Sequence, residues 1–165
     1  MKSQLLVFLL MSVSALSSFS DKSGKSLPDA EITGNQIDKE LLLDLVNDVR
    51  TNGCFCGADY YLPVEPVSWN DTLEDVAKEH SNDMYFKRFF NHIGSDGSNP
   101  GESLSRHGYR WSGVGENLAM NYKTEEKVFY GWMGSYGHCK NIMNARYRNI
   151  GIAHTGYYWT MVLAS

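Results

Sequence analysis

The sequence predicts an α+β domain in which helices cover a mainly antiparallel sheet. Three stretches have the apolar spacing of helices, whereas the chain ends in two strand-like segments, 149–154 and 157–163. The Thr155-Gly156 pair between these segments is typical of a β-hairpin turn. Helices and strands do not alternate regularly along the chain, which favours an antiparallel sheet with helices packed on it over a parallel α/β arrangement.

Three long helices follow from apolar residues that recur every three to four positions. The first spans 37–49 and ends at Asn52-Gly53, which is a good stop signal. The second opens at Asn70-Asp71 and carries an apolar stripe that includes His80, and the third runs over 124–136. Because His80 falls on the apolar side of its helix, we expect a hydrogen-bonded core histidine rather than a ligand.

Shorter elements lie between the long helices. Prolines within 60–67 indicate an extended connection, and a short helix is expected over 103–107. The segment 114–120 reads as a further strand, and 91–101 is a polar loop that holds His92.

The first 34 residues carry the features of an export signal and a linker. Lys2 precedes an apolar run, and small residues follow before Asp21, so we expect a signal peptide over 1–20. An N-terminal membrane anchor is the alternative, but the run is shorter than the roughly 20 residues that span a bilayer. Residues 21–34 read as a flexible linker and 35–165 as one folded domain. We therefore expect a secreted protein without a stable membrane span.

The charge distribution bears on the partners of the protein. The 165 residues carry a formal net charge of -4, and lysines and arginines are scattered along the chain. A phosphate backbone requires a basic face, and none is indicated. We therefore expect no nucleic acid partner.

Three cysteines, Cys54, Cys56 and Cys139, allow three possible pairings. An exported protein with three cysteines is expected to form one disulfide and to keep one thiol. A Cys54–Cys56 bond would close a very small ring, whereas a Cys56–Cys139 bond would close a loop worth roughly 4–5 kcal/mol in the chain-entropy model. The residues alone leave the pairing open.

Two short runs hold the candidate functional residues. Gly115-Glu116-Asn117 and Gly137-His138 place a carboxylate and an imidazole among turn-forming residues, and His92 lies upstream. Two imidazoles and one carboxylate match a zinc ligand set that keeps an open position. The same three groups could instead move a proton or form a buried polar network. The chemistry of the trio is open at this point.

Several runs in order resemble the CAP superfamily, which comprises the cysteine-rich secretory proteins, antigen 5 and pathogenesis-related 1 and is also called the SCP domain. The matching runs extend from the first helix to the C-terminus and are Val67 to Leu73, His80 to Met84, Phe90-Asn91-His92, Gly108-Tyr109, Gly115 to Ala119, Trp132, Gly137-His138, Asn141 to Asn144 and Tyr158-Trp159-Thr160. The resemblance implies a CAP domain over 35–165, folded as a three-layer α/β/α sandwich with a mainly antiparallel central sheet.

The resemblance also implies a cleft lined by His92, Glu116 and His138. Ser135 stands where animal and plant members carry a second acid, so a mechanism that needs two carboxylates is not expected. The sequence is most similar to short bacterial members, which often carry Cys-Gly and Gly-His-Cys, here at Cys56 and Cys139. That likeness implies a Cys56–Cys139 disulfide and leaves Cys54 as the free thiol.

The function implied is that of a secreted, non-enzymatic binding or interaction module. Some family members bind a divalent metal in this cleft, so His92, Glu116 and His138 are candidate ligands for zinc or another divalent ion. A metal-dependent hydrolase that uses the same cleft is one alternative, and a sterol or fatty-acid binding protein is another. The expected partner is an extracellular protein, lipid or sterol.

Overall fold

A four-stranded sheet forms the centre of the computed structural model, which describes residues 37–165. The strand order is β3 (Ser68–Trp69), β5 (Asn149–Thr155), β6 (Tyr158–Ala164) and β4 (Val114–Met120). The strands β5, β6 and β4 are antiparallel, and β3 joins β5 in parallel. The predicted strand at 114–120 and the C-terminal hairpin are confirmed. The predicted signal peptide and linker lie outside the described residues.

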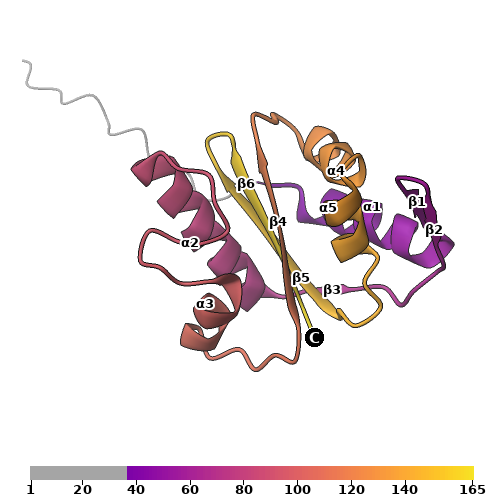
Figure 1. Ribbon diagram of the computed structural model, residues 1–165, viewed down its shortest axis with the longest axis horizontal. Helices are drawn as coiled ribbons and strands as arrows, with labels where there is room; N and C mark the ends of the chain where they lie inside the picture. The colour runs from indigo at the N-terminus through magenta and orange to yellow at the C-terminus, as the bar shows by residue number, and fades with distance from the viewer. Residues whose placement is uncertain (1–36) are drawn as a thin grey trace, which may run out of the picture. The chain divides into compact units, whose positions relative to one another are not determined.

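Helices cover both faces of this sheet (Figure 1). On one face lie α2 (Asp71–Lys87) and α3 (Pro100–Arg106). On the other face lie α1 (Lys39–Asn52), α4 (Glu125–Met133) and α5 (Tyr136–Ile142). A two-stranded ribbon, β1 (Cys54–Cys56) with β2 (Asp59–Tyr61), follows α1. The fold is therefore the predicted three-layer α/β/α sandwich. Among the described residues, no helix is long and apolar enough to cross a membrane.

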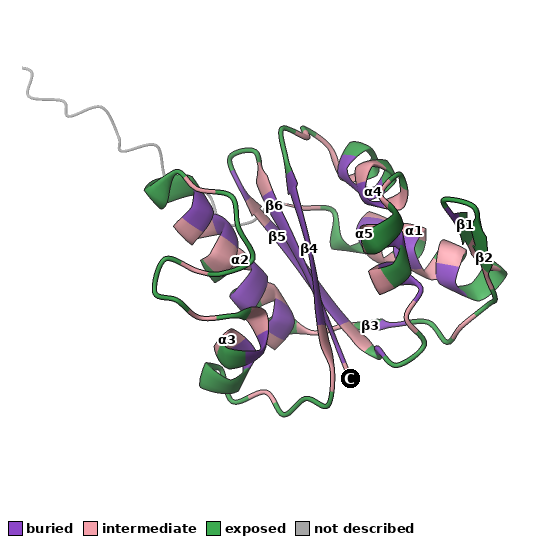
Figure 2. Cartoon of the chain, in the orientation of Figure 1, coloured by how far each residue is buried: buried purple, intermediate pink, exposed green. Residues whose placement is uncertain are grey.

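Each face of the sheet has its own apolar cluster, and the strands between them are almost entirely buried (Figure 2). Trp132, Trp159 and Phe129 dominate the cluster on the α1, α4 and α5 side. The cluster under α2 and α3 is built from smaller side chains. There the start of α2 lies directly on Gly151 of β5, where a side chain would collide with the helix backbone. Close approach of two backbones is a setting that glycine permits.

Helix ends follow from capping side chains. Asp38, Asn70, Asn99 and Thr124 each accept a hydrogen bond from a backbone amide in the first turn of α1, α2, α3 and α4. These side chains satisfy amide groups that have no partner inside the helix. Asn99 and Glu102 form a full capping box, and Pro100 occupies the first turn. The short helix therefore begins three residues before the predicted 103–107.

The third predicted helix is wrong as a single element. Instead of one helix over 124–136, α4 ends at Met133, and α5 begins after Ser135, whose extended backbone makes it an N-cap residue. Gly134 is the residue that caps the end of α4, a place where glycine is common, and the extended backbone of Ser135 ends the helical run. The new helix carries His138 and Cys139.

Arg50 ties three segments together at the buried end of α1. Its side chain is fully buried and donates hydrogen bonds to the carbonyl oxygens of Glu65, Ile142, Asn144 and Tyr147. Burial and, to a lesser degree, the charge of Arg148 lower the pKa of Arg50 to about 10. The guanidinium therefore stays charged at neutral pH, and carbonyl dipoles surround it.

A disulfide joins Cys56 of β1 to Cys139 of α5, as the resemblance implied. Their Cα atoms are 5.5 Å apart, and the two cysteines are separated by 83 residues in the chain. The bond attaches the ribbon to α5 and so to the segment that carries His138. Cys54 keeps a free thiol.

Candidate functional site

Glu116 lies in the middle of β4 and is 8% exposed. Successive side chains of a strand point to opposite faces. Glu116 accordingly reaches residues of the α2 side, His80 and His92, whereas its neighbour Asn117 donates a hydrogen bond to the carbonyl oxygen of His138 in α5. The strand β4 thus separates two groups of polar residues.

The first group centres on the His92–Glu116 pair. Nδ1 of His92 lies 2.7 Å from Oε1 of Glu116, and the histidine side chain is 55% exposed while that of Glu116 is 4% exposed. The hydrogen bond to Glu116 raises the pKa of His92, and the charge of Glu116 adds to this, against partial burial that lowers it. A carboxylate accepts the Nδ1 proton, which leaves Nε2 of the ring to face outward.

His80 is a second imidazole beside the same carboxylate. Its Nε2 lies 2.9 Å from the carbonyl oxygen of Asn91 and 4.0 Å from Oε1 of Glu116. A carbonyl oxygen only accepts, so Nε2 of His80 carries the proton. The predicted hydrogen bond is present. The approach to Glu116 was not predicted, because a helical stripe indicates which residues of α2 face inward and not which residue of the sheet lies opposite them.

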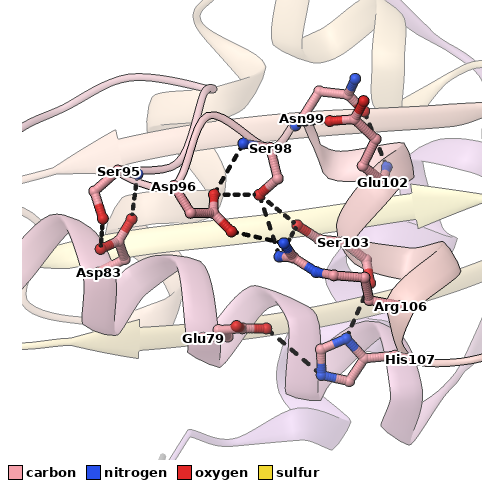
Figure 3. Close-up of polar contacts among 10 residues, drawn as sticks. All are labelled: Glu79, Asp83, Ser95, Asp96, Ser98, Asn99, Glu102, Ser103, Arg106 and His107. Carbon is pink, nitrogen blue, oxygen red and sulfur yellow. Dashed lines mark hydrogen bonds and ion pairs between the residues drawn. The ribbon is translucent and has the colours of Figure 1, made fainter.

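The loop that carries His92 is held by a network of short polar contacts (Figure 3). Asp83 of α2 accepts hydrogen bonds from the amide and hydroxyl of Ser95. Asp96 accepts from the hydroxyl of Ser98 at 2.6 Å and from Arg106 of α3 at 2.6 Å. These bonds fasten the loop to both helices, so His92 is presented from an anchored segment.

The second group holds His138. The amide side chain of Asn141 donates to the carbonyl oxygen of Glu116 and to Oδ1 of Asn117, which fixes α5 against β4. His138 is half-buried, and burial, together with the charge of His92, lowers its pKa. The pKa values of the two histidines therefore move in opposite directions.

Not all of the predicted site residues touch one another. Among residues 37–165, the ring of His138 makes no hydrogen bond or ion pair with Glu116, and Ser135 makes no side-chain capping bond to α5. Ser135 lies half-buried at the start of α5 and acts through its backbone, which accepts a bond from Cys139. The structure thus pairs His92 with Glu116, whereas His138 lies in α5, on the other side of β4.

The donor set suits a divalent metal chemically. Imidazole nitrogens are common ligands of zinc, and a histidine ligand usually donates its other ring proton to a carboxylate. His92 has this arrangement with Glu116. Within the described part of the chain, the three cysteines are the cluster whose ligand atoms all lie within 4.8 Å of one another, so the cleft trio is not gathered to that degree. A shared ion would require a side-chain rotation.

A pocket of about 250 Å³ adjoins Glu116. Its wall is formed by Asn99, Pro100, Gly101, Trp111 and Val114. The indole of Trp111 donates to the carbonyl oxygen of Gly101 at 3.0 Å, which holds this aromatic wall against α3. The carboxylate of Glu116 therefore lines a small pocket whose one aromatic side chain is that of Trp111.

The profile of the cysteine-rich secretory protein family (CAP) matches residues 43–162. The chain therefore belongs to the CAP family.

Relatives share sequence with the chain, and solved structures share its fold. The chain is 34% identical over 99 residues to YkwD of Bacillus subtilis, a match that covers 59% of this chain and 38% of that protein. An extracellular SCP-domain protein from Bacillus anthracis has a TM-score of 0.66 at 25% identity, over 76% of this chain and 39% of that one. An outer surface protein from Borrelia burgdorferi has a TM-score of 0.65 at 22% identity, over 80% and 98%. The chain thus spans less than half the length of YkwD.

Proposed function

We propose that this CAP domain is a secreted binding module whose cleft holds a divalent metal through His92 and His138. The observation that carries the proposal is the His92–Glu116 pair, with Nδ1 and Oε1 2.7 Å apart. Glu116 fixes the tautomer and the orientation of the ring, and the lone pair of Nε2 of His92 is then available to a metal ion. Glu116 then positions His92 and is not itself a required ligand.

The pKa values support the assignment of roles. Burial keeps His138 neutral to lower pH than usual, and a neutral imidazole is the form that binds a metal. His92 has a raised pKa because of Glu116, so protons compete with a metal for this ring below neutral pH. Metal binding is therefore expected to strengthen as the pH rises through neutrality.

Calorimetric titration with zinc tests the site directly. The wild-type protein is expected to bind zinc, and His92→Ala and His138→Ala are expected to remove the binding heat. Glu116→Gln keeps the size of the side chain and is expected to weaken binding by about 10- to 100-fold.

His107→Ala provides the matched control, because His107 ends α3 and pairs with Glu79 at 3.5 Å rather than with Glu116. Identical heats for the wild type, His92→Ala and His138→Ala would overturn the metal site. Turnover of a casein or peptide library that depends on His92 would instead favour a metal-dependent hydrolase.

Two features bear on the alternatives. The hydrogen bond from His92 to Glu116 would suit a metal ligand and a general base alike, whereas Ser135 stands where the resemblance places a second acid, so a mechanism that needs two carboxylates is not supported. The pocket beside Glu116 is about 250 Å³. Pockets for drug-sized ligands are roughly 300–1,000 Å³, so this hollow does not favour a sterol. The pocket volume and Ser135 therefore support a binding module over a sterol carrier or a hydrolase that needs two carboxylates.

A further inference from the structure

The ribbon β1–β2 carries two cysteines that face the same neighbour. Cys54 and Cys56 are separated by one residue in β1, and alternate residues of a strand share a face. Both sulfurs therefore approach Cys139 of α5. The sulfur of Cys54 lies 4.0 Å from the sulfur of Cys139, and all three sulfurs lie within 4.8 Å of one another. A free thiol is thus placed beside a formed disulfide.

The two ribbon cysteines differ in exposure. Cys56 and Cys139 are fully buried, whereas Cys54 is half-buried. The sulfur of Cys139 also lies 3.8 Å from the carbonyl oxygen of Phe55, the residue between the two ribbon cysteines. Cys139 is therefore situated between two candidate partners and not against Cys56 alone.

Chain connectivity does not distinguish the two pairings. The Cys56–Cys139 bond joins residues 83 apart, and a Cys54–Cys139 bond would join residues 85 apart. The entropy of loop closure varies with the logarithm of loop length, so it is almost the same for both. The preference must come from local packing at the ribbon.

We infer that Cys54, Cys56 and Cys139 form a thiol–disulfide exchange site in which Cys139 alternates between Cys56 and Cys54. The thiolate of Cys54 attacks the sulfur of Cys139, a Cys54–Cys139 bond forms and the Cys139–Cys56 bond breaks. The electron pair leaves with Cys56, whose thiolate takes up a proton, so the proton lost from Cys54 is balanced and no external oxidant is consumed. No step of the exchange uses a metal ion.

This exchange changes which thiol the protein presents to solvent. With Cys56 bonded, the free thiol is the half-buried Cys54, which can be reached by small thiol reagents and disulfides. With Cys54 bonded, the free thiol is Cys56 at a fully buried position.

Burial raises the pKa of Cys54, so little thiolate is present at neutral pH and the exchange is expected to be slow. Tyr136 of α5 donates to the carboxylate of Asp59 at 3.0 Å, so the ribbon stays attached while the bond changes.

Trapping of free thiols in the wild-type chain tests the inference. The protein is equilibrated in a buffer of reduced and oxidised glutathione and quenched with acid. Unfolding in N-ethylmaleimide then labels every free thiol. Tandem mass spectrometry distinguishes a label on Cys54 from one on Cys56. Reduction of the disulfide would free Cys56 and Cys139 together, so only chains labelled on Cys56 alone report the exchange. We expect these chains to rise at least about tenfold over a sample quenched without glutathione. Label confined to Cys54 after equilibration would overturn the exchange.

Two variants sharpen the result. In Cys56→Ser, Cys54 and Cys139 are expected to form a disulfide in the same buffer, which a cross-linked peptide identifies. Cys54→Ser is the matched control, and it is expected to keep the Cys56–Cys139 bond. Free Cys54 and Cys139 in a Cys56→Ser protein that remains folded by circular dichroism would contradict the inference. If Cys56→Ser does not fold, the wild-type labelling decides alone.

Discussion

Two buried charges, Arg50 and Glu116, are stabilised in different ways within one domain. Arg50 is fully buried and donates to four backbone carbonyl oxygens from segments far apart in the chain. Glu116 is nearly buried, but its side-chain contacts are His80 and the half-exposed His92. Backbone dipoles cannot titrate, whereas imidazoles change charge near neutral pH. Arg50 is thus held by partners whose charge is fixed, and Glu116 by partners whose charge depends on pH.

Loss of Arg50 is expected to have the largest effect on stability. Arg50→Met removes the guanidinium and leaves buried carbonyl oxygens without donors, so the free energy of unfolding should fall by about 3–5 kcal/mol. Urea unfolding measures this change. Arg110, which is exposed, provides the control as Arg110→Met, with a change within about 0.5 kcal/mol. Equal effects of the two substitutions would refute a structural role for Arg50.

Loss of Glu116 is expected to have a smaller effect on stability and a clear effect on a neighbour. Glu116→Ala should lower the free energy of unfolding by about 1–3 kcal/mol, because His92 and His80 lose a hydrogen-bonded or charged partner. Glu116→Gln should return the pKa of His92 toward its ordinary value. Thermal unfolding and NMR titration of the His92 ring measure the two effects. An unchanged melting curve together with an unchanged pKa of His92 would show that the pair is not formed in solution.

The pH dependence of the free energy of unfolding distinguishes His92 from His138 and is expected to be the smallest effect. The pKa of His92 is raised on folding, so its stabilising contribution is present below pH 6.5 and is lost as the pH rises through its folded pKa. The pKa of His138 is lowered, so its folded neutral ring costs stability as the pH falls below 6.5.

Stability measured from pH 5 to pH 8 in the His92→Ala and His138→Ala variants checks these opposite signs. His92→Ala should remove the loss of stability above pH 6.5. His138→Ala should remove the loss below it. Slopes that change in the same direction in both variants would contradict the assignment.

The seven-residue strands, the helices α1 and α2 and the short helix α3 were predictable, whereas the shorter strands and the break between α4 and α5 were not. Apolar periodicity needs several turns or alternations to show itself, so α1, α2, β4 and the C-terminal hairpin were readable. The strands β1, β2 and β3 have two or three residues each, too few for a pattern. The break between α4 and α5 was missed because Val128 and Trp132 continue a helical spacing up to it, and Gly134 was not read as an end.

The candidate residues could be chosen from the sequence, but their geometry could not. Two short runs singled out Glu116 and His138, with His92 upstream, and the resemblance to a family assigned the three to one cleft, since no spacing rule joins residues from a loop, a strand and a helix. Whether Glu116 touches His92 or His138 depends on which face of β4 each residue occupies. The contact of His80 with Glu116 depends on how α2 packs on the sheet, which is a property of the folded chain.

The position of Glu116 next to Asn117 makes the site sensitive to strand parity. Glu116 reaches the α2 side and Asn117 the α5 side because a strand alternates its faces. A shift of β4 by one residue against Tyr158–Ala164 of β6 would exchange these roles and turn a carboxylate toward α5. Loops next to β4 can change length without altering which side Glu116 and Asn117 face. A single-residue insertion inside β4 would reverse the sides that they face.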